Sequence, residues 1–276
     1  MIKYLENGFA YLHIINDVME AKIALQGAHL FSFKHENKEL LWVSDASEFT
    51  QSKAIRGGIP ICWPSFGNNN PELPQHGFAR TAMWELAESL SLTNESTKIV
   101  LRLVNGDDFY DIWNYKSEVQ ITFILGKTLN IQITTTNQDT KPFELTQALH
   151  TYFFVSDIKA VKITGLEDKP YFNALANKYY TSKDSITFDG EVDAVFQEVD
   201  KPIKLIDKEQ SVKIINRGSN SVVVWNPWIE KGAKMSGMNR DDYRKFVCIE
   251  SANAYEDKRT LQPKESHTLE AFFEFS

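Results

Sequence analysis

Alternation of apolar and polar residues with a period of two is the pattern that most constrains this chain. Every second side chain is apolar in residues 121–125 (Ile121, Phe123 and Leu125) and again in residues 129–134 (Leu129 and Ile131), and Gly126-Lys127-Thr128 separates the two runs. Successive side chains of a β-strand point to opposite faces of a sheet. Each run therefore predicts a strand with one buried face, and the residues between them predict a hairpin turn.

Many further short apolar runs, separated by polar turns, predict additional strands. They cover residues 9–15, 21–33, 40–43, 83–92, 98–104, 143–155, 160–165, 211–217, 221–225, 246–251 and 267–275. No amphipathic helix longer than two or three turns is expected, and the long connections 44–75 and 167–193 are expected to be rim loops over a sheet. This pattern predicts an all-β chain built as a β-sandwich. Since no low-complexity linker or composition shift divides it, residues 1–276 are expected to form a single domain.

The composition limits the partners that this chain can have. Of the 276 residues, 42% are apolar, which is ample for a large core. The formal net charge of −7 argues against a general nucleic-acid or anionic-membrane surface, so an anionic small ligand would have to be held by a few local cations. Two cysteines outside any CxxC pair provide neither a disulfide framework nor a thiolate zinc site. With no signal-peptide pattern and no membrane-length apolar run, a cytoplasmic location is expected.

Residues 56–80 are too rich in Gly, Pro and Asn to form a helix or a long strand, and they are expected to follow the edge of a cleft. Two arginines, Arg56 and Arg80, and one histidine, His76, occur close in sequence to Trp63 and Trp84. This combination suits a site for an anionic ligand with a partly apolar face, such as a sugar phosphate. It also fits a surface loop whose arginines pair with structural carboxylates, and composition alone leaves both interpretations open.

Three ionisable residues outside that loop are candidates for chemistry. His150 occurs in a strand-like run, where a packed core histidine is the commoner outcome, and Glu250 also occurs in an apolar run, where a carboxylate must be paired or shifted in pKa. Glu250 could instead form a structural salt bridge, and Asp193 could lie in a solvated turn after Gly190.

A histidine and a carboxylate would suffice for acid–base chemistry on a sugar hemiacetal. One group would remove the proton from the anomeric hydroxyl while the other protonates the ring oxygen. The ring would then open and reclose as the other anomer without a cofactor. The run Trp225-Asn226-Pro227-Trp228 could place an aromatic wall beside a sugar, although core packing followed by a turn is the favoured interpretation.

Several other site classes are absent from the sequence. There is no GxxxxGK[ST] loop, GxGxxG turn, GxSxG elbow or HExxH pair, and no two of the six histidines have metal-ligand spacing. No metal or other cofactor is therefore expected. A two-carboxylate glycosidase stays possible in principle, but no pair of carboxylates stands out.

Five segments together resemble the hexose-6-phosphate mutarotase (glucose-6-phosphate 1-epimerase) branch of the aldose 1-epimerase family. They occur in the family's order over most of the chain, and they are Arg56-Gly57-Gly58-Ile59-Pro60-Ile61-Cys62-Trp63-Pro64, His76-Gly77-Phe78-Ala79-Arg80, His150-Thr151-Tyr152-Phe153, Trp225-Asn226-Pro227-Trp228 and Glu250-Ser251-Ala252. The resemblance implies a large antiparallel β-sandwich of the galactose-mutarotase (supersandwich) type. It also implies interconversion of the α and β anomers of a hexose 6-phosphate.

The resemblance assigns roles to individual positions. Glu250 would be the general base at the anomeric hydroxyl and His150 the general acid at the ring oxygen. The residues expected to bind substrate are Arg56, Gln75, His76, Arg80 and Asp193, with the two arginines at the phosphate. The partner is thus expected to be a small hexose 6-phosphate, with no nucleic acid and no membrane, and the protein a monomer.

Two departures from the family pattern concern the sugar. Ala194 stands where a basic residue is expected after Asp193, and residues 232–240 are only loosely similar to the family. Two other functions stay open: an aldose 1-epimerase acting on neutral sugars, and a sugar-phosphate binding protein without turnover. The acid–base pair of His150 and Glu250 favours an enzyme over the second of these.

Overall fold

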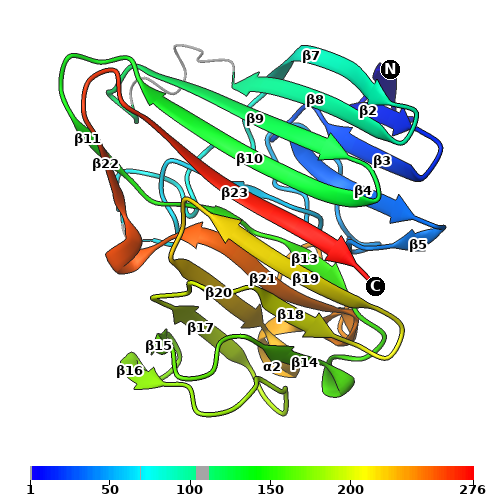
Figure 1. The fold of residues 1–276 in the computed structure, drawn as a ribbon, viewed down its shortest axis with the longest axis vertical. Helices are drawn as coiled ribbons and strands as arrows, with labels where there is room; N and C mark the ends of the chain where they lie inside the picture. The colour runs from blue at the N-terminus through cyan, green and yellow to red at the C-terminus, as the bar shows by residue number, and fades with distance from the viewer. Residues whose placement is uncertain (1, 69, 104–111) are drawn as a thin grey trace.

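Two eight-stranded antiparallel sheets dominate the computed structural model, which describes residues 2–68, 70–103 and 112–276. Figure 1 shows them as two layers, with a smaller sheet at the N-terminal end. The first large sheet has the order β14-β18-β19-β23-β10-β9-β8-β7, and its strands are β14 (Lys162–Thr164), β18 (Ile203–Ile206), β19 (Ser211–Arg217), β23 (Ser266–Phe275), β10 (Thr128–Asn137), β9 (Ser117–Leu125), β8 (Ser96–Leu103) and β7 (Trp84–Thr93).

The second large sheet has the order β16-β15-β17-β20-β21-β12-β6, with β13 also paired to β21. Its strands are β16 (Lys178–Thr181), β15 (Pro170–Asn173), β17 (Val192–Phe196), β20 (Ser221–Asn226), β21 (Phe246–Asn253), β12 (Gln147–Leu149), β13 (Tyr152–Phe154) and β6 (Ile61–Cys62). The N-terminal sheet contains β1 (Ile2–Tyr4), β2 (Ala10–Ile15), β3 (Met19–Ala24), β4 (His29–His35) and β5 (Lys38–Glu39), and β11 (Phe143–Leu145) pairs with β22 (Arg259–Leu261).

Helical structure among the described residues is short. It consists of the α-helix α2 (Trp228–Gly232) and the 3-10 helices η1 (Ile158–Ala160), η2 (Asp242–Lys245) and η3 (Tyr255–Asp257). None of the helices in this part of the chain is long and apolar enough to cross a membrane.

The predicted hairpin is the centre of the first sheet. Leu125 of β9 faces Leu129 of β10 across the turn, and the alternating apolar side chains of both strands are buried, as the period-two pattern predicts. They belong to a large buried cluster that also takes side chains from the second sheet and from the N-terminal sheet. Phe153 of β13 packs edge-on against Phe273 of β23 at 5.4 Å, which joins the two large sheets directly.

Several predicted elements are wrong in their boundaries. Residues 21–33 are not one strand, because the chain turns between β3 and β4 at Gly27, where φ is +76° and a Cβ would lie 2.5 Å from the carbonyl oxygen of Arg80. Residues 143–155 form three short strands, with a break at His150. The supposed rim loop 167–193 contains the hairpin β15–β16, and the predicted strand 98–104 extends to Val104, which lies outside the described residues.

The two faces of the second sheet have different surroundings. On β17 the side chain of Ala194 belongs to the core between the sheets, whereas its neighbour Val195 belongs to a separate cluster on the other face. That cluster also contains Tyr152, Val223 and Trp225. Since alternate residues of a strand share a face, Asp193 lies on the same face as Val195. This outer face carries the candidate site.

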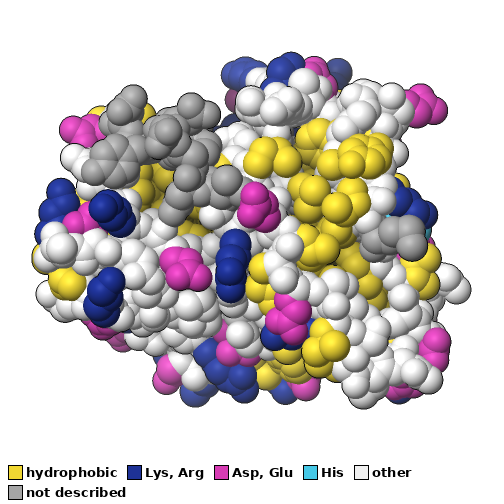
Figure 2. Space-filling view, turned by 90° about the horizontal axis from the view of Figure 1, so that it is seen from above, with side chains coloured by type: hydrophobic (Ala, Val, Ile, Leu, Met, Phe, Trp, Pro, Cys, Tyr) yellow, Lys and Arg dark blue, Asp and Glu magenta, His cyan; other side chains and the backbone are white. Residues whose placement is uncertain are grey.

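Strand β7 forms one edge of the first sheet and exposes several apolar side chains. They are Leu86, Leu90 and Leu92, and Met83 immediately before the strand is also exposed. The view from above in Figure 2 shows apolar side chains gathered on one half of the surface, with acidic and basic residues around them. Glu88 in the middle of β7 pairs with Lys98 of β8 at 2.8 Å, and charges on an edge strand oppose pairing with another sheet.

Candidate active site

A pocket of about 220 Å³ opens on the outer face of the second sheet. The loop over residues 56–80 forms one side of it through Arg56, His76 and Arg80, as predicted for the edge of a cleft. The other side comes from the sheet and includes Trp225 and Asp193. Segments that are far apart in the sequence therefore meet at one hollow.

His150 and Glu250 lie together in this pocket. The Nε2 atom of His150 is 3.3 Å from Oε1 of Glu250, and the two residues are only 8% and 1% exposed. His150 occupies the break between β12 and β13, both of which pair with β21, the strand that carries Glu250. The break is held by hydrogen bonds from the backbone N–H of His150 to the carbonyl of Pro60 and from Ile249 to Thr151.

The surroundings push the pKa values of the pair in opposite directions. Burial raises the pKa of Glu250 well above its usual range, and the nearby Asp193 adds to this shift. Burial also lowers the pKa of His150 well below its usual range, and His76, Arg80 and Arg56 lower it further. Both shifts favour the neutral form of the group, so the two shifts together favour a pair that holds a single proton.

Several buried polar atoms of the site lack a hydrogen-bond partner among the residues that the structure describes. They are Nδ1 of His150, Oε2 of Glu250 and Nε of Arg56. Most buried polar groups in folded proteins are hydrogen-bonded, and an unpaired one costs about 1–3 kcal/mol. Three such atoms around one hollow are typical of a site whose polar partners come from a ligand.

His76 is held in one orientation and one tautomer. Its backbone has φ of +63°, and its Nδ1 accepts a hydrogen bond from the backbone N–H of Gly67 at 3.3 Å. Burial, with help from Arg80 and Arg56, lowers the pKa of His76 to about 3. The ring is therefore neutral with its proton on Nε2, which can donate a hydrogen bond.

The two arginines of the pocket are positioned by different contacts. Arg80 donates a hydrogen bond through Nη2 to the backbone carbonyl of Gln75 at 2.7 Å, so Gln75 orients Arg80 through its main chain as well as lining the pocket. Arg56 donates through Nη1 to the hydroxyl of Tyr152 at 3.5 Å. Two guanidinium groups at one pocket can bind an anionic group with charge-assisted hydrogen bonds.

The aromatic residues at the site differ from those that the sequence suggested. Trp63 and Trp84 are fully buried, and their indole N–H groups donate to Thr135 and to the carbonyl of Ala79, so neither lines the pocket. Their expected place beside a ligand was wrong, because proximity in sequence does not set the direction of a side chain. Trp225 instead contributes to the wall of the pocket.

The ring of Tyr152 lies parallel to that of His150, with 4.8 Å between centroids.

The run Trp225-Asn226-Pro227-Trp228 combines both of the uses considered from sequence, a wall beside a ligand and core packing followed by a turn. Trp225 packs in the outer cluster and lines the pocket, while Asn226 makes the turn that follows. The side chain of Asn226 donates to the carbonyls of Tyr243 and Phe246 and accepts from the backbone N–H of Trp228.

Sequence reasoning missed one cation of the pocket, Lys231 of α2. Its Nζ lies 2.7 Å from Oε1 of Glu191 and 3.6 Å from Oδ2 of Asp193. Burial raises the pKa of Asp193, and Lys231 partly opposes that shift. The only sequence signal was its position shortly after the Trp225-Asn226-Pro227-Trp228 run and directly before residues 232–240, which match the family pattern loosely.

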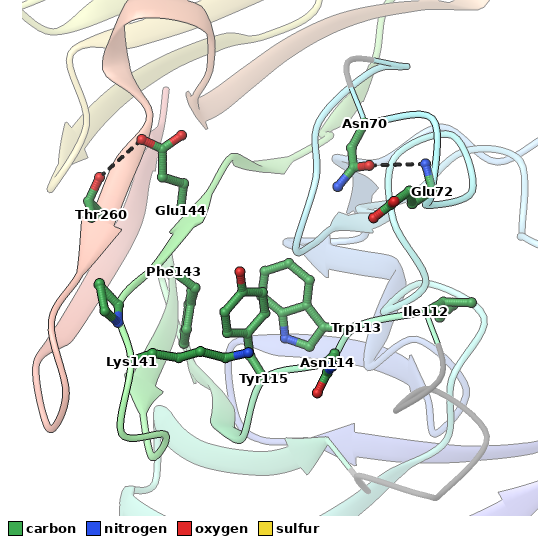
Figure 3. A pocket seen from close by; sticks show the side chains of 11 residues that line it. Asn70, Glu72, Ile112, Trp113, Asn114, Tyr115, Lys141, Phe143, Glu144 and Thr260 are labelled. Atoms are coloured by element: carbon green, nitrogen blue, oxygen red, sulfur yellow. Dashed lines mark hydrogen bonds between the residues drawn. The ribbon is translucent and has the colours of Figure 1, made fainter.

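A second and larger hollow, of about 1000 Å³, lies elsewhere on the surface. Figure 3 shows the rings of Trp113, Tyr115 and Phe143 side by side in it, with Lys141 reaching toward them. The Nζ atom of Lys141 is 4.7 Å from the centroid of Tyr115. None of the site residues predicted from sequence lines this hollow, whereas all of them line the smaller pocket.

Comparison with known proteins identifies the family. The aldose 1-epimerase family model matches residues 11–273. The chain belongs to the aldose 1-epimerase family.

Individual relatives agree with this assignment. A protein of Cenchrus ciliaris, provisionally named a glucose-6-phosphate 1-epimerase, is 37% identical over 258 residues, which cover 89% of this chain and 78% of the relative. A crystal structure from Salmonella typhimurium, provisionally described as a mutarotase, superposes on this chain with a TM-score of 0.92 at 28% identity. The match covers 100% of this chain and 92% of the Salmonella chain.

A galactose mutarotase-like protein from Lactobacillus casei shares the fold at a TM-score of 0.73 and 16% identity, covering 96% of this chain and 100% of its own. The predicted all-β fold of the galactose-mutarotase type is thus confirmed.

Proposed function

We propose that this protein is a hexose-6-phosphate mutarotase, an isomerase that interconverts the α and β anomers of glucose 6-phosphate and related sugars. The observation that carries the proposal is the buried pair of His150 and Glu250 in a pocket that also contains Arg56 and Arg80. The family and the name of the Cenchrus relative support the same reaction.

The pair can run the reaction in both directions with one proton. With the shared proton on His150 instead of Glu250, the Glu250 carboxylate takes the proton of the anomeric hydroxyl while His150 gives its proton to the ring oxygen, and the C1–O5 bond breaks. The open chain then turns about the C1–C2 bond. On closure, neutral His150 takes the proton of the C5 hydroxyl as O5 attacks C1, and Glu250 returns its proton to the former carbonyl oxygen. The pair ends as it began.

The remaining residues of the site bind the sugar phosphate. Arg56 and Arg80 hold the phosphate, since two guanidinium groups can make several charge-assisted hydrogen bonds to it. His76 donates from Nε2 to a sugar oxygen near His150, because the two rings are 5.7 Å apart. Asp193 accepts a hydrogen bond from a sugar hydroxyl, and Gln75 keeps Arg80 in place.

We further propose a single domain over residues 1–276, because one buried cluster draws side chains from all three larger sheets. A monomeric state, a cytoplasmic location and the lack of a nucleic-acid or membrane partner stay predictions.

Magnetisation-exchange NMR on equilibrated anomers tests the proposal. Catalytic amounts of protein should enhance α–β exchange of glucose 6-phosphate much more than that of glucose. Equal enhancement of both sugars would favour the neutral-sugar aldose 1-epimerase. Enhancement of neither, with binding of the phosphate retained, would favour a binding protein without turnover.

A further inference from the structure

Lys231 is a cation of the pocket to which neither the sequence nor the family match gives a role. Its side chain is 42% exposed and lines the same hollow as Glu250. The ammonium group lies 2.7 Å from Glu191, 3.6 Å from Asp193 and 5.9 Å from the centroid of the Trp225 ring. Lys231 therefore stands between an acidic pair and an aromatic wall.

The fold explains why this cation comes from α2 and not from β17. Asp193 of β17 pairs with Trp225 of β20, and the turn at Asn226 leads directly from Trp225 into α2. Ala194, where a basic residue was expected, belongs to the core on the opposite face of the sheet. A side chain at 194 on this strand would point away from the pocket, whereas Lys231 reaches Asp193 from the neighbouring turn.

The charges of the pocket fall into two groups around the acid–base pair. Arg56 donates to the hydroxyl of Tyr152, whose ring stacks on His150, and Arg80 donates to the carbonyl of Gln75, the residue before His76. Asp193 lies beside Lys231, and its charge acts on Glu250. The arginines are thus associated with the histidine end of the pocket, and Asp193 with Lys231 is associated with the glutamate end.

The groups of a hexopyranose 6-phosphate are divided in a similar way on the two sides of C1. The ring oxygen and the C6 phosphate lie on one side of C1, and the hydroxyls of C2 and C3 follow on the other side. With the ring oxygen at His150 and the anomeric hydroxyl at Glu250, the phosphate falls toward the arginines, and the C2–C3 edge falls toward Asp193 and Lys231.

We propose that Lys231 is a substrate-binding residue that, together with Asp193, binds the hydroxyls of C2 and C3. This inference rests on the proposed function for the placement of the sugar. An ammonium group has three N–H donors, of which Glu191 takes one, so donors are left for a hydroxyl. Asp193 accepts from one hydroxyl, Lys231 donates to its neighbour, and Trp225 contacts the apolar face of the ring.

The experiment compares Lys231→Met with Lys234→Met as a matched control. Lys234 lies three residues farther along and is exposed, and it does not line the pocket. Each variant is assayed by anomer exchange on glucose 6-phosphate, 2-deoxyglucose 6-phosphate and 3-deoxyglucose 6-phosphate. We expect Lys231→Met to lower kcat/KM for glucose 6-phosphate about 10-fold or more, and Lys234→Met to change it less than about 2-fold.

The deoxy sugars separate binding from a structural role. If Lys231 binds a hydroxyl, the decrease in kcat/KM caused by Lys231→Met should be less than about 3-fold for the analogue that lacks that hydroxyl. Lys231→Arg, which keeps the charge and the donors, should restore part of the activity on glucose 6-phosphate. The same loss with all three sugars, or no loss with glucose 6-phosphate, would overturn the proposal.

A binding measurement separates this inference from the proposed function. If the unmodified protein does not enhance exchange of any sugar phosphate, the mutarotase function fails. Calorimetric affinities for the same three sugars then decide the role of Lys231. A drop in affinity on Lys231→Met that disappears with one deoxy analogue would support the proposed role of Lys231. The same drop with all three sugars, no drop with any of them, or no binding of any sugar would overturn that role.

Discussion

Glu250 approaches His150 to 3.3 Å across the break between β12 and β13, so a carboxyl and an imidazole face each other in a buried site. Burial raises the pKa of the first and lowers the pKa of the second. The two shifts therefore favour a pair that holds one proton. One shared proton is what a reversible ring opening requires, because one group must accept a proton while the other donates.

The rate of anomer exchange should follow this shared proton. Below the lowered pKa of His150 the pair takes up a second proton, so the carboxylate base is lost and the rate falls. Above the raised pKa of Glu250 the pair loses its only proton, so the acid is lost and the rate falls again. We expect a broad plateau around neutral pH in kcat for glucose 6-phosphate. A rate that rises continuously with pH would contradict a shared proton.

Removal of the carboxylate should abolish most of the catalysis. Glu250→Gln keeps the size of the side chain but cannot accept the anomeric proton, so kcat should fall by about 10²- to 10⁴-fold. Glu144→Gln is a suitable control, because Glu144 is exposed, pairs with Lys258 and lies outside the pocket. Retention of full activity by Glu250→Gln, with an unchanged thermal unfolding curve, would show that another group is the base.

Asp193 should set the alkaline limit of the plateau. Burial is the main cause of the raised pKa of Glu250, and the negative charge of Asp193 raises that pKa further. In Asp193→Asn the repulsion is lost, the pKa of Glu250 falls, and the pair loses its proton at a lower pH. The alkaline limb of the kcat profile should therefore move to lower pH, while Glu191→Gln, which leaves Asp193 charged, should move it less. An alkaline limb that stays in place in Asp193→Asn would disprove this coupling.

Arg80 should distinguish phosphorylated from neutral sugars. Arg80→Ala removes a guanidinium that Gln75 holds at the pocket, so KM for glucose 6-phosphate should rise about 10- to 100-fold, as expected for loss of a charge-assisted hydrogen bond. The rate with glucose should change little. Arg102→Ala, which removes an exposed arginine of β8 outside the pocket, is the matched control. Equal effects of Arg80→Ala on both sugars would contradict a phosphate role.

The fold was more predictable than the site. Period-two alternation predicts the β9–β10 hairpin because each strand buries one face, and that information is local. The contact of His150 with Glu250 depends on the register of β21 against two separate strands, which no local pattern contains. In the same way, Trp63 is next to a site segment in sequence, yet its side chain points into the core. Lys231 was missed because only the tertiary fold places α2 beside Asp193.

Two glycines of the site loop offer a test of how tightly it is packed. Gly67 and Gly77 both have positive φ, at +69° and +70°, but only Gly77 approaches other backbone closely. A Cβ at Gly77 would collide with the carbonyl of Trp63, whereas a Cβ at Gly67 would meet no atom of the described residues within 4 Å. The alanine variants therefore share the cost of a left-handed backbone and differ in the collision.

Gly67→Ala should lower the free energy of unfolding by about 1–2 kcal/mol, the usual cost of a left-handed conformation in a residue with a Cβ. Gly77→Ala should lower it by at least about 2 kcal/mol more, because backbone atoms cannot move aside as a flexible side chain can. Gly77→Ala should also reduce the anomer-exchange activity of the folded fraction, because a backbone shift at residue 77 would move the adjacent His76 as well. Urea unfolding and NMR exchange measure the two effects. Equal destabilisation by the two variants would mean that the contact between Gly77 and Trp63 is loose, and that His76 is not held by it.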